Sequence, residues 1–277
     1  MTLAELLVAL SLGGVVLAVA ASSMLRQQRG VRWVEGLSGA ELQLRPVLRL
    51  FADELSVLDA SAGDIAPGQA SDSSLQLRAE IAASLTCDSS ATVTLLPATS
   101  AAPDMAGIAR APAIGDSVWL YRDPSIGWTV RGVTGVARIT SGCGVPTSAP
   151  GPTYKLMLNA PADVPGGTPV RVTRWERWVV YRGSDGRWYA GIRDFSPGTP
   201  VFLAAQPIAG PLMHVMRGGA RTGFRYFDAA GSALVPNGTN ERSISRVRVT
   251  TLSVVPSSTD SVRLDSADAV LSRAGAP

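Results

Sequence analysis

The stretch LRPVLRLFADELSVL, residues 44–58, carries the pattern on which the expected fold rests. Its apolar side chains recur in steps of four, three, four and three, which places them on one side of an α-helix. Charged side chains lie largely off this stripe. We therefore predict an amphipathic helix that packs on another layer of the protein through Leu44, Leu48, Phe51, Leu55 and Leu58, with Leu37 continuing the stripe upstream.

The same helix is predicted to extend over residues 26–58. Pro46 lacks a backbone N–H donor, so a bend is expected near residues 42–46. The small-residue segment Ala60–Ser74 follows, and the helix is expected to end before it, near Leu58.

Downstream of the helix, short runs of alternating apolar and polar residues predict half-buried strands. Trp175–Tyr181, an Asp-Gly turn at 183–186 and Arg187–Ile192 together predict a hairpin. The other predicted strands are Ser74–Ile81, Ala91–Leu96, Val118–Tyr121, Trp128–Val133, Tyr154–Leu158, Gly223–Asp228 and Ile244–Val255.

The segment after the helix is long enough to bury one sizeable core, so residues 59–256 are predicted to form a single β-rich domain. Residues 257–277 are expected to be a polar, mostly unstructured tail. The predicted fold class is α+β: a long N-terminal helix, transmembrane and then amphipathic, packed on a mainly antiparallel β-sheet.

Upstream, residues 1–25 form an apolar run in which Glu5 is the single charged side chain. A run of this length is about long enough to cross a bilayer as one helix. A carboxylate in hydrocarbon is costly unless it is neutralised or paired, so Glu5 predicts a functional contact.

The flanking charges and the cysteines predict opposite locations for the domain. Arg26, Arg29 and Arg32 alone would hold the following domain in the cytoplasm. Cys87 and Cys143, the two cysteines, are most simply interpreted as one disulfide formed outside the cytoplasm. A short basic leader before Met1 would remove this conflict.

The residues Thr2-Leu3-Ala4-Glu5-Leu6-Leu7-Val8-Ala9-Leu10 resemble the start of mature type IV pilins and type II secretion pseudopilins. In that family a prepilin peptidase cuts after a leader ending in Gly and methylates the new N-terminus. The resemblance implies N-methylation at Met1 and a contact between Glu5 and the Met1 amino group of a neighbouring subunit, with Thr2 part of the same assembly motif. Two departures are the missing Gly site and Ser22, where many pilins have Pro.

The overall layout is similar to large minor subunits, the PilW-like pilins and the J-type pseudopilins. This resemblance implies a structural subunit that helps to initiate or cap filament assembly. It also implies a single-pass inner-membrane location with the C-terminal domain in the periplasm, before incorporation into a periplasmic or surface filament through the N-terminal helix. The tip subunit in the resembling secretion systems lacks the acid, so Glu5 implies a position below another subunit.

Catalysis, cofactors and metals find little support in the residue types. His214 is the one histidine and lies without a nucleophile motif nearby, so no catalytic residue is predicted. No phosphate-binding loop, zinc spacing or EF-hand pattern occurs, and neither a cofactor nor a metal is expected. Asp185, Asp194 and Asp228 are interpreted as turn residues that satisfy their own backbone.

Nucleic-acid binding is not expected. The net charge is only +3, and the basic residues are spread over the chain. A basic face on the last strands would need the side chains of Arg221, Arg225, Arg242, Arg246 and Arg248. Arginines at alternate strand positions more often form a solvated face paired with acids.

One alternative stays open, a membrane-tethered extracytoplasmic binding or adhesin-like domain that does not polymerise. The coding sequence upstream separates the two: a basic leader ending in Gly favours the filament subunit, and a true start at Met1 favours the tethered domain. The choice between a pilus and a secretion pseudopilus also stays open.

We predict that Cys87 and Cys143 are joined in the mature protein. Closing a loop of this length stabilises the folded state by roughly 4 kcal/mol on the chain-entropy estimate. Labelling of thiols in the unfolded, non-reduced protein should detect none, and a labelled cysteine at either position would disprove the pairing.

Overall fold

The computed structural model describes residues 24, 27–28, 31, 44–89, 92–95, 107–123, 127–139, 153–196, 199, 201–213, 221–254 and 262–271. The longest helical run in these ranges is 44–56. The other elements are β1 (Ile65–Ala70), β2 (Ser74–Ser89), β3 (Thr92–Leu95), β4 (Gly107–Ile108), β5 (Ser117–Asp123), β6 (Gly127–Ile139), β7 (Thr153–Leu158), β8 (Pro169–Arg182), β9 (Trp188–Ser196), β10 (Val201–Phe202), β11 (Gln206–Leu212), β12 (Gly223–Phe227), β13 (Ala233–Leu234), the 3₁₀ helix η2 (Glu241–Ser243), β14 (Arg246–Val254) and β15 (Val262–Val270).

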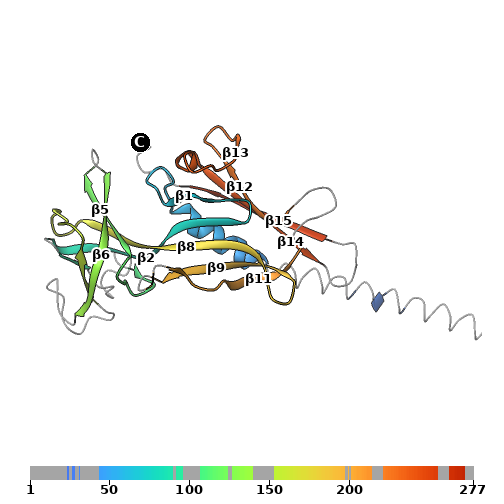
Figure 1. The fold of residues 1–277 in the computed structure, drawn as a ribbon, viewed down its shortest axis with the longest axis horizontal. Coiled ribbons are helices and arrows are strands. Elements are labelled where there is room, and N and C mark those ends of the chain that lie inside the picture. The colour runs from blue at the N-terminus through green and yellow to red at the C-terminus, as the bar shows by residue number, and fades with distance from the viewer. Residues whose placement is uncertain are drawn as a thin grey trace, which may run out of the picture.

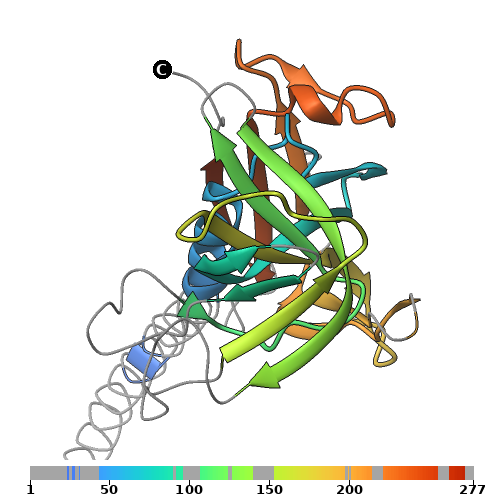
Figure 2. The same cartoon turned by 90° about the vertical axis from the view of Figure 1, so that its left-hand side faces the viewer.

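Two long strands, β2 and β8, organise the larger sheet (Figure 1). They pair antiparallel from Ser74 opposite Val179 to Leu85 opposite Pro169, with a bulge between Glu80 and Ala82. At one end they close a ring of strands in the order β2, β3, β7, β6, β5, β8. In Figure 2 this ring faces the viewer. At the other end they continue as an open sheet with β1, β9, β10 and β11.

Each end of the β2–β8 pair encloses a separate hydrophobic core. The interior of the ring contains Ile81, Leu95, Leu120, Leu156 and Val172, all essentially inaccessible to solvent. The second core lies under the open sheet. The two strands contribute to both cores from successive parts of their length, with Val172 of β8 and Ile81 of β2 in the ring and Trp178 of β8 and Leu77 of β2 in the second core.

The second core is a three-layer arrangement. Helix 44–56 lies between the open sheet and a four-stranded sheet in the order β13, β12, β14, β15 (Figure 1). The hydroxyl of Tyr226 on β12 donates to the carbonyl of Ser71, before β2, at 2.7 Å and so joins the two sheets directly.

The predicted helical stripe is confirmed where it is described: Leu44, Leu48, Phe51, Leu55 and Leu58 are all buried. Each strand predicted downstream coincides with an observed strand, although β2, β6 and β8 run further than their patterns indicated. The predicted hairpin is β8–β9, and Gly186 adopts a positive φ of 78° in its turn, as an Asp-Gly turn requires.

The predicted fold class is nevertheless wrong. Within the described residues, strands make up 58% and helix 11%, so the described structure is mostly β with one short helix and does not show a long N-terminal helix on a sheet. The physical reason is that the helical stripe is covered on two sides by two antiparallel sheets. The helix is thus a short internal layer of a β protein.

Within the described ranges, no helix combines the length and the apolar character that crossing a membrane requires. The run 44–56 is shorter than the roughly 20 apolar residues of a span, and its outer side carries Arg45, Arg49 and Asp53. The structure therefore does not support the predicted transmembrane helix or the predicted single-pass inner-membrane location. That prediction referred to residues 1–25, of which 1–23 and 25 lie outside the described residues, as do residues 26, 29–30 and 32–43 of the predicted amphipathic helix.

Two further differences come from strands without a clear alternating pattern. Residues 262–270, predicted as polar tail, form β15 and pair with β14 over its whole length. Ile65–Ala70, inside the small-residue segment, forms β1 against β2. Both segments become strands because a neighbouring strand offers unpaired backbone groups, which the local sequence does not reveal.

We predict that Leu55→Ala lowers the free energy of unfolding by about 3 kcal/mol, because it removes a fully buried side chain and leaves a cavity. Leu50→Ala is the matched control on the same helix, where the leucine is 41% exposed, and it should change little. Urea unfolding of the two variants measures the difference. Equal effects would show that the helix does not pack as described.

Candidate functional site

Phe51 is the centre of the seam between helix 44–56 and the two sheets. Its ring meets Trp178 of β8 edge-on, with centroids 5.4 Å apart, and lies 5.7 Å from the ring of Phe224 on β12. Aromatic pairs at these distances stabilise beyond the area that they bury. One side chain of the helix therefore holds both sheets.

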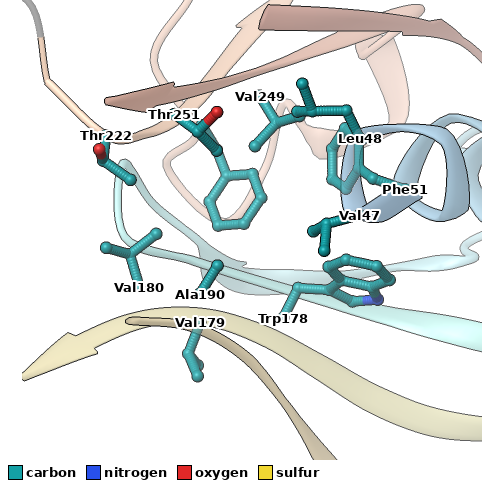
Figure 3. Close-up of a pocket in the computed structure, with 11 residues that line it drawn as sticks. Val47, Leu48, Phe51, Trp178, Val179, Val180, Ala190, Thr222, Val249 and Thr251 are labelled. Carbon is teal, nitrogen blue, oxygen red and sulfur yellow. The ribbon is translucent and has the colours of Figure 1, made fainter. Parts of the chain in front are cut away.

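A small pocket opens beside Phe51 between the three layers (Figure 3). Its lining is apolar apart from two threonines, and the Thr222 hydroxyl is already bonded to the backbone of Met213 and Leu252. A ligand site normally adds a few converging polar groups to an apolar lining. This pocket lacks such groups, and we interpret it as a packing gap at the seam, lined by Val47, Leu48, Phe51, Trp178, Val179, Val180, Ala190, Thr222, Phe224, Val249 and Thr251.

The first described residue of the helix, Leu44, already lies in this seam. Leu44 is 1% exposed and packs with Ala209 and Leu212 of β11. The first described turn of the helix is therefore already part of the folded domain, and no loose joint lies between residue 44 and the sheets.

Near Glu54 of the helix, Arg110 binds two carboxylates, those of Glu176 and Asp194. Glu176 of β8 is 3% exposed and lies directly opposite Asp194 of β9. Arg110 binds both, at 3.0 Å to Glu176 and 2.8 Å to Asp194. Burial raises the pKa of Glu176, and Arg110 partly offsets this. Burial, and then the charge of Glu176, raise the pKa of Glu54 on the helix.

These charges fasten the segment 107–116 to the sheet. Arg110 lies on it, and Asp116 at its end accepts two hydrogen bonds from Arg174 of β8, at 2.7 and 2.8 Å. Buried ion pairs of this kind fix geometry more than they add stability. We interpret the cluster as a structural latch, and within the described residues no group of acidic, histidine or cysteine side chains has the arrangement of a metal site.

An arginine–tryptophan stack lies on the opposite face of the larger sheet and was not predicted. Rings and guanidinium groups alternate, with ring-to-cation distances of 4.1 to 5.5 Å, in the order Trp175, Arg78, Trp119, Arg171, Trp128. A signal was present in β8, where Arg171 and Trp175 share one face of the strand. Their partners on β2, β5 and β6 depend on strand order, which the sequence pattern did not predict.

The predicted assembly residues Met1, Thr2 and Glu5 lie outside the described residues, so their roles stay predictions. Cys87 at the end of β2 is disulfide-bonded, and Cys143, its predicted partner, lies outside the described ranges. His214 also lies outside the described residues.

Two of the three aspartates that were interpreted as turn residues satisfy their own turns. Asp185 accepts from the Arg187 amide, and Asp228 accepts from the Ser232 amide. Asp194 instead belongs to the Arg110 cluster.

The basic face that was considered and not expected on the last strands is partly neutralised. Arg248 binds Asp268 of β15 through two hydrogen bonds of 2.6 and 2.7 Å, and Arg246 stacks on Phe227 at 4.3 Å. Arg225 lies opposite Arg248 on β12. This arrangement fits a solvated face paired with an acid better than a nucleic-acid site.

Comparison with known proteins found no matching family model, no matching curated protein and no matching solved structure.

We predict that Glu54→Gln stabilises the protein at pH 7 and has little effect near pH 4. Because the pKa of Glu54 in the folded protein is above its ordinary 4.5, the folded state binds the proton more tightly than the unfolded state. The stability linked to Glu54 is therefore fully present below that ordinary value and is lost as pH rises through the raised pKa. Glutamine removes this loss.

Urea unfolding at the two pH values measures the effect. Asp163→Asn, at an exposed loop position, is the control and should show no such pH-dependent gain. A Glu54→Gln variant that is equally stabilised at both pH values, or at neither, would contradict the argument.

Proposed function

We propose that the chain is a structural, non-enzymatic subunit of a type IV pilin-like filament, either a minor pilin or a type II secretion pseudopilin. The sequence support is the motif Thr2–Leu10, which resembles the assembly segment of that family. The structural support is that the described domain begins, at residue 44, with a helix buried in its core.

The attachment at residue 44 is the observation that carries the proposal. Leu44 is buried against β11 of the open sheet, and Leu48, Phe51 and Leu55 are buried between the two sheets, so the described domain begins with residues of its core. A subunit in a filament must hold its domain at a set position relative to the segment that packs in the filament. A buried helix transmits position and load directly into both sheets.

A binding domain that does not polymerise need not be held at a set position relative to its anchor. Polar or Gly-rich linkers are sufficient to tether a domain, because the ligand site works in any orientation of the tether. The buried connection therefore favours the filament subunit over the alternative of a tethered adhesin-like domain.

The other polar clusters agree with a structural role. The Arg110 cluster and the arginine–tryptophan stack fasten strands and loops to one another. Neither presents a nucleophile beside a general base, which hydrolytic sites of the serine or cysteine type require.

The proposed partners are other pilin or pseudopilin subunits, which the N-terminal segment would contact, and the prepilin peptidase. In the filament, the Glu5 carboxylate would meet the terminal amino group of a neighbouring subunit. In a low-dielectric bundle these opposite charges attract strongly, whereas either alone is penalised.

We predict that Glu5→Gln yields a folded protein that enters filaments poorly, because the neighbouring amine loses its counter-charge. The amount of each variant in sheared filament fractions, relative to the amount in cells, measures incorporation. Glu35→Gln is the matched control, the same substitution beyond the motif, and should incorporate like the parent protein. Equal incorporation of Glu5→Gln and the parent would refute this role for Glu5 and favour the tethered domain.

A further inference from the structure

Two arginines face each other on the outer side of the open sheet. Arg177 of β8 and Arg193 of β9 are directly opposite in the antiparallel register. Gln76 of β2 is opposite Arg177 on its other side, so the three residues form one row across three strands. Directly opposite residues point to the same face, and their side chains are neighbours.

Neither guanidinium has an acidic partner within the described residues. Arg177 donates to the side-chain oxygens of Gln69 and Gln76, at 2.8 and 2.6 Å. Arg193 donates to the backbone oxygens of Leu203 and Phe202, at 2.8 and 3.3 Å. All four acceptors are neutral, so two positive charges stand side by side without compensation.

The carboxylates nearest in sequence do not compensate them. Glu176 and Asp194 each adjoin one of the arginines in the chain, but successive side chains of a strand point to opposite faces. Both acids bind Arg110 on the inner face. In agreement, burial and then the charge of Arg193 lower the pKa of Arg177.

Three other arginines on or beside the larger sheet have acidic partners, whereas Arg78, Arg122 and Arg131 donate to neutral oxygens. Arg171 binds Asp64 at 2.9 Å, Arg174 binds Asp116 at 2.7 Å, and Arg110 binds Glu176 and Asp194. In each case a carboxylate neutralises a partly buried guanidinium. The Arg177–Arg193 pair lacks this partner although like charges directly opposite each other in a sheet are destabilising.

The surroundings hold the pair in place. The Phe202 ring lies 4.4 Å from the guanidinium carbon of Arg177 and packs edge-on against Phe195 at 5.4 Å. The glutamine and carbonyl contacts orient both guanidinium groups, so little side-chain entropy is left to lose on binding an anion. The Nε of Arg177 is buried and has no hydrogen-bond partner within the described residues.

We propose that Arg177 and Arg193 form a binding site for an oxyanion, a phosphate or carboxylate group. Two oriented guanidinium groups match such groups through paired, charge-assisted hydrogen bonds. A bound oxyanion removes the repulsion between the arginines, and the Phe202 ring borders the site on the side of Arg177. The inference does not depend on the filament proposal.

The test uses thermal unfolding of the full-length protein in sodium phosphate and in sodium chloride at equal ionic strength. Phosphate also stabilises proteins generally, by exclusion from their surface, so the decisive quantity is the difference between variants. We expect the phosphate-dependent rise in Tm to be largest in the parent protein and reduced to the general effect in Arg177→Gln and in Arg193→Gln. Each variant should bind phosphate about tenfold more weakly.

Arg182→Gln is the matched control. Arg182 lies on the same strand, is exposed and binds the carbonyl of Gly186 at 2.8 Å, and its strand partner is Trp188, not an arginine. This variant should respond to phosphate like the parent. Identical phosphate shifts in the parent, Arg177→Gln and Arg193→Gln would overturn the proposal.

Two further arms complete the test. Arg193→Lys retains the charge but not the planar fork of the guanidinium group. An intermediate phosphate-dependent rise in Tm in this variant supports the site even if a glutamine variant fails to fold. A rise as large as that of the parent in both Arg193→Lys and Arg177→Lys overturns bidentate recognition. Sodium acetate at the same ionic strength identifies the source of the oxyanion. A specific shift in acetate assigns carboxylates as well, and a shift in phosphate alone assigns phosphate.

Discussion

Burial of one helical stripe between two sheets is the constraint on which the rest of the structure depends. Phe51 contacts Trp178 on one side and Phe224 on the other, and Leu44, Leu48 and Leu55 extend that contact along the helix. Without this layer, the open sheet and the four-stranded sheet would each expose an apolar face. The helix is short, but it is the surface on which both sheets close.

The long strands β2 and β8 connect this three-layer region to the closed ring (Figure 1). The bulge between Glu80 and Ala82 lies where the pair passes from one region to the other. A bulge bends a strand and increases its twist, which allows the same two strands to line a curved ring and a flatter sheet. The two cores are therefore mechanically continuous, and a load applied at the helix reaches the ring through backbone hydrogen bonds.

Arginine supplies the positive charge in each ion pair described above, and its surroundings separate structural from functional interpretations. At three buried carboxylates, those of Asp64, Asp116 and Glu176, an arginine neutralises the charge. Where tryptophan rings are available, arginines stack between them. Arg177 and Arg193 fit neither arrangement fully, because their acceptors are neutral and their charges are adjacent. This contrast is why that pair, and not the arginine–tryptophan stack, carries the binding proposal.

The sequence by itself determined the local features. The spacing of Leu44 to Leu58 determined which side of the helix is buried, and the Asp-Gly turn determined the β8–β9 hairpin, because both follow from periodicity and backbone preference over a few residues. It did not determine the fold class, β1, β15 or the ring, because strand pairing is set by partners distant in the chain and weakly patterned strands such as β15 are defined by their neighbours. The same holds for the candidate sites: Arg177 and Arg193 are visible as residues, but only the β8–β9 register places them side by side without a carboxylate.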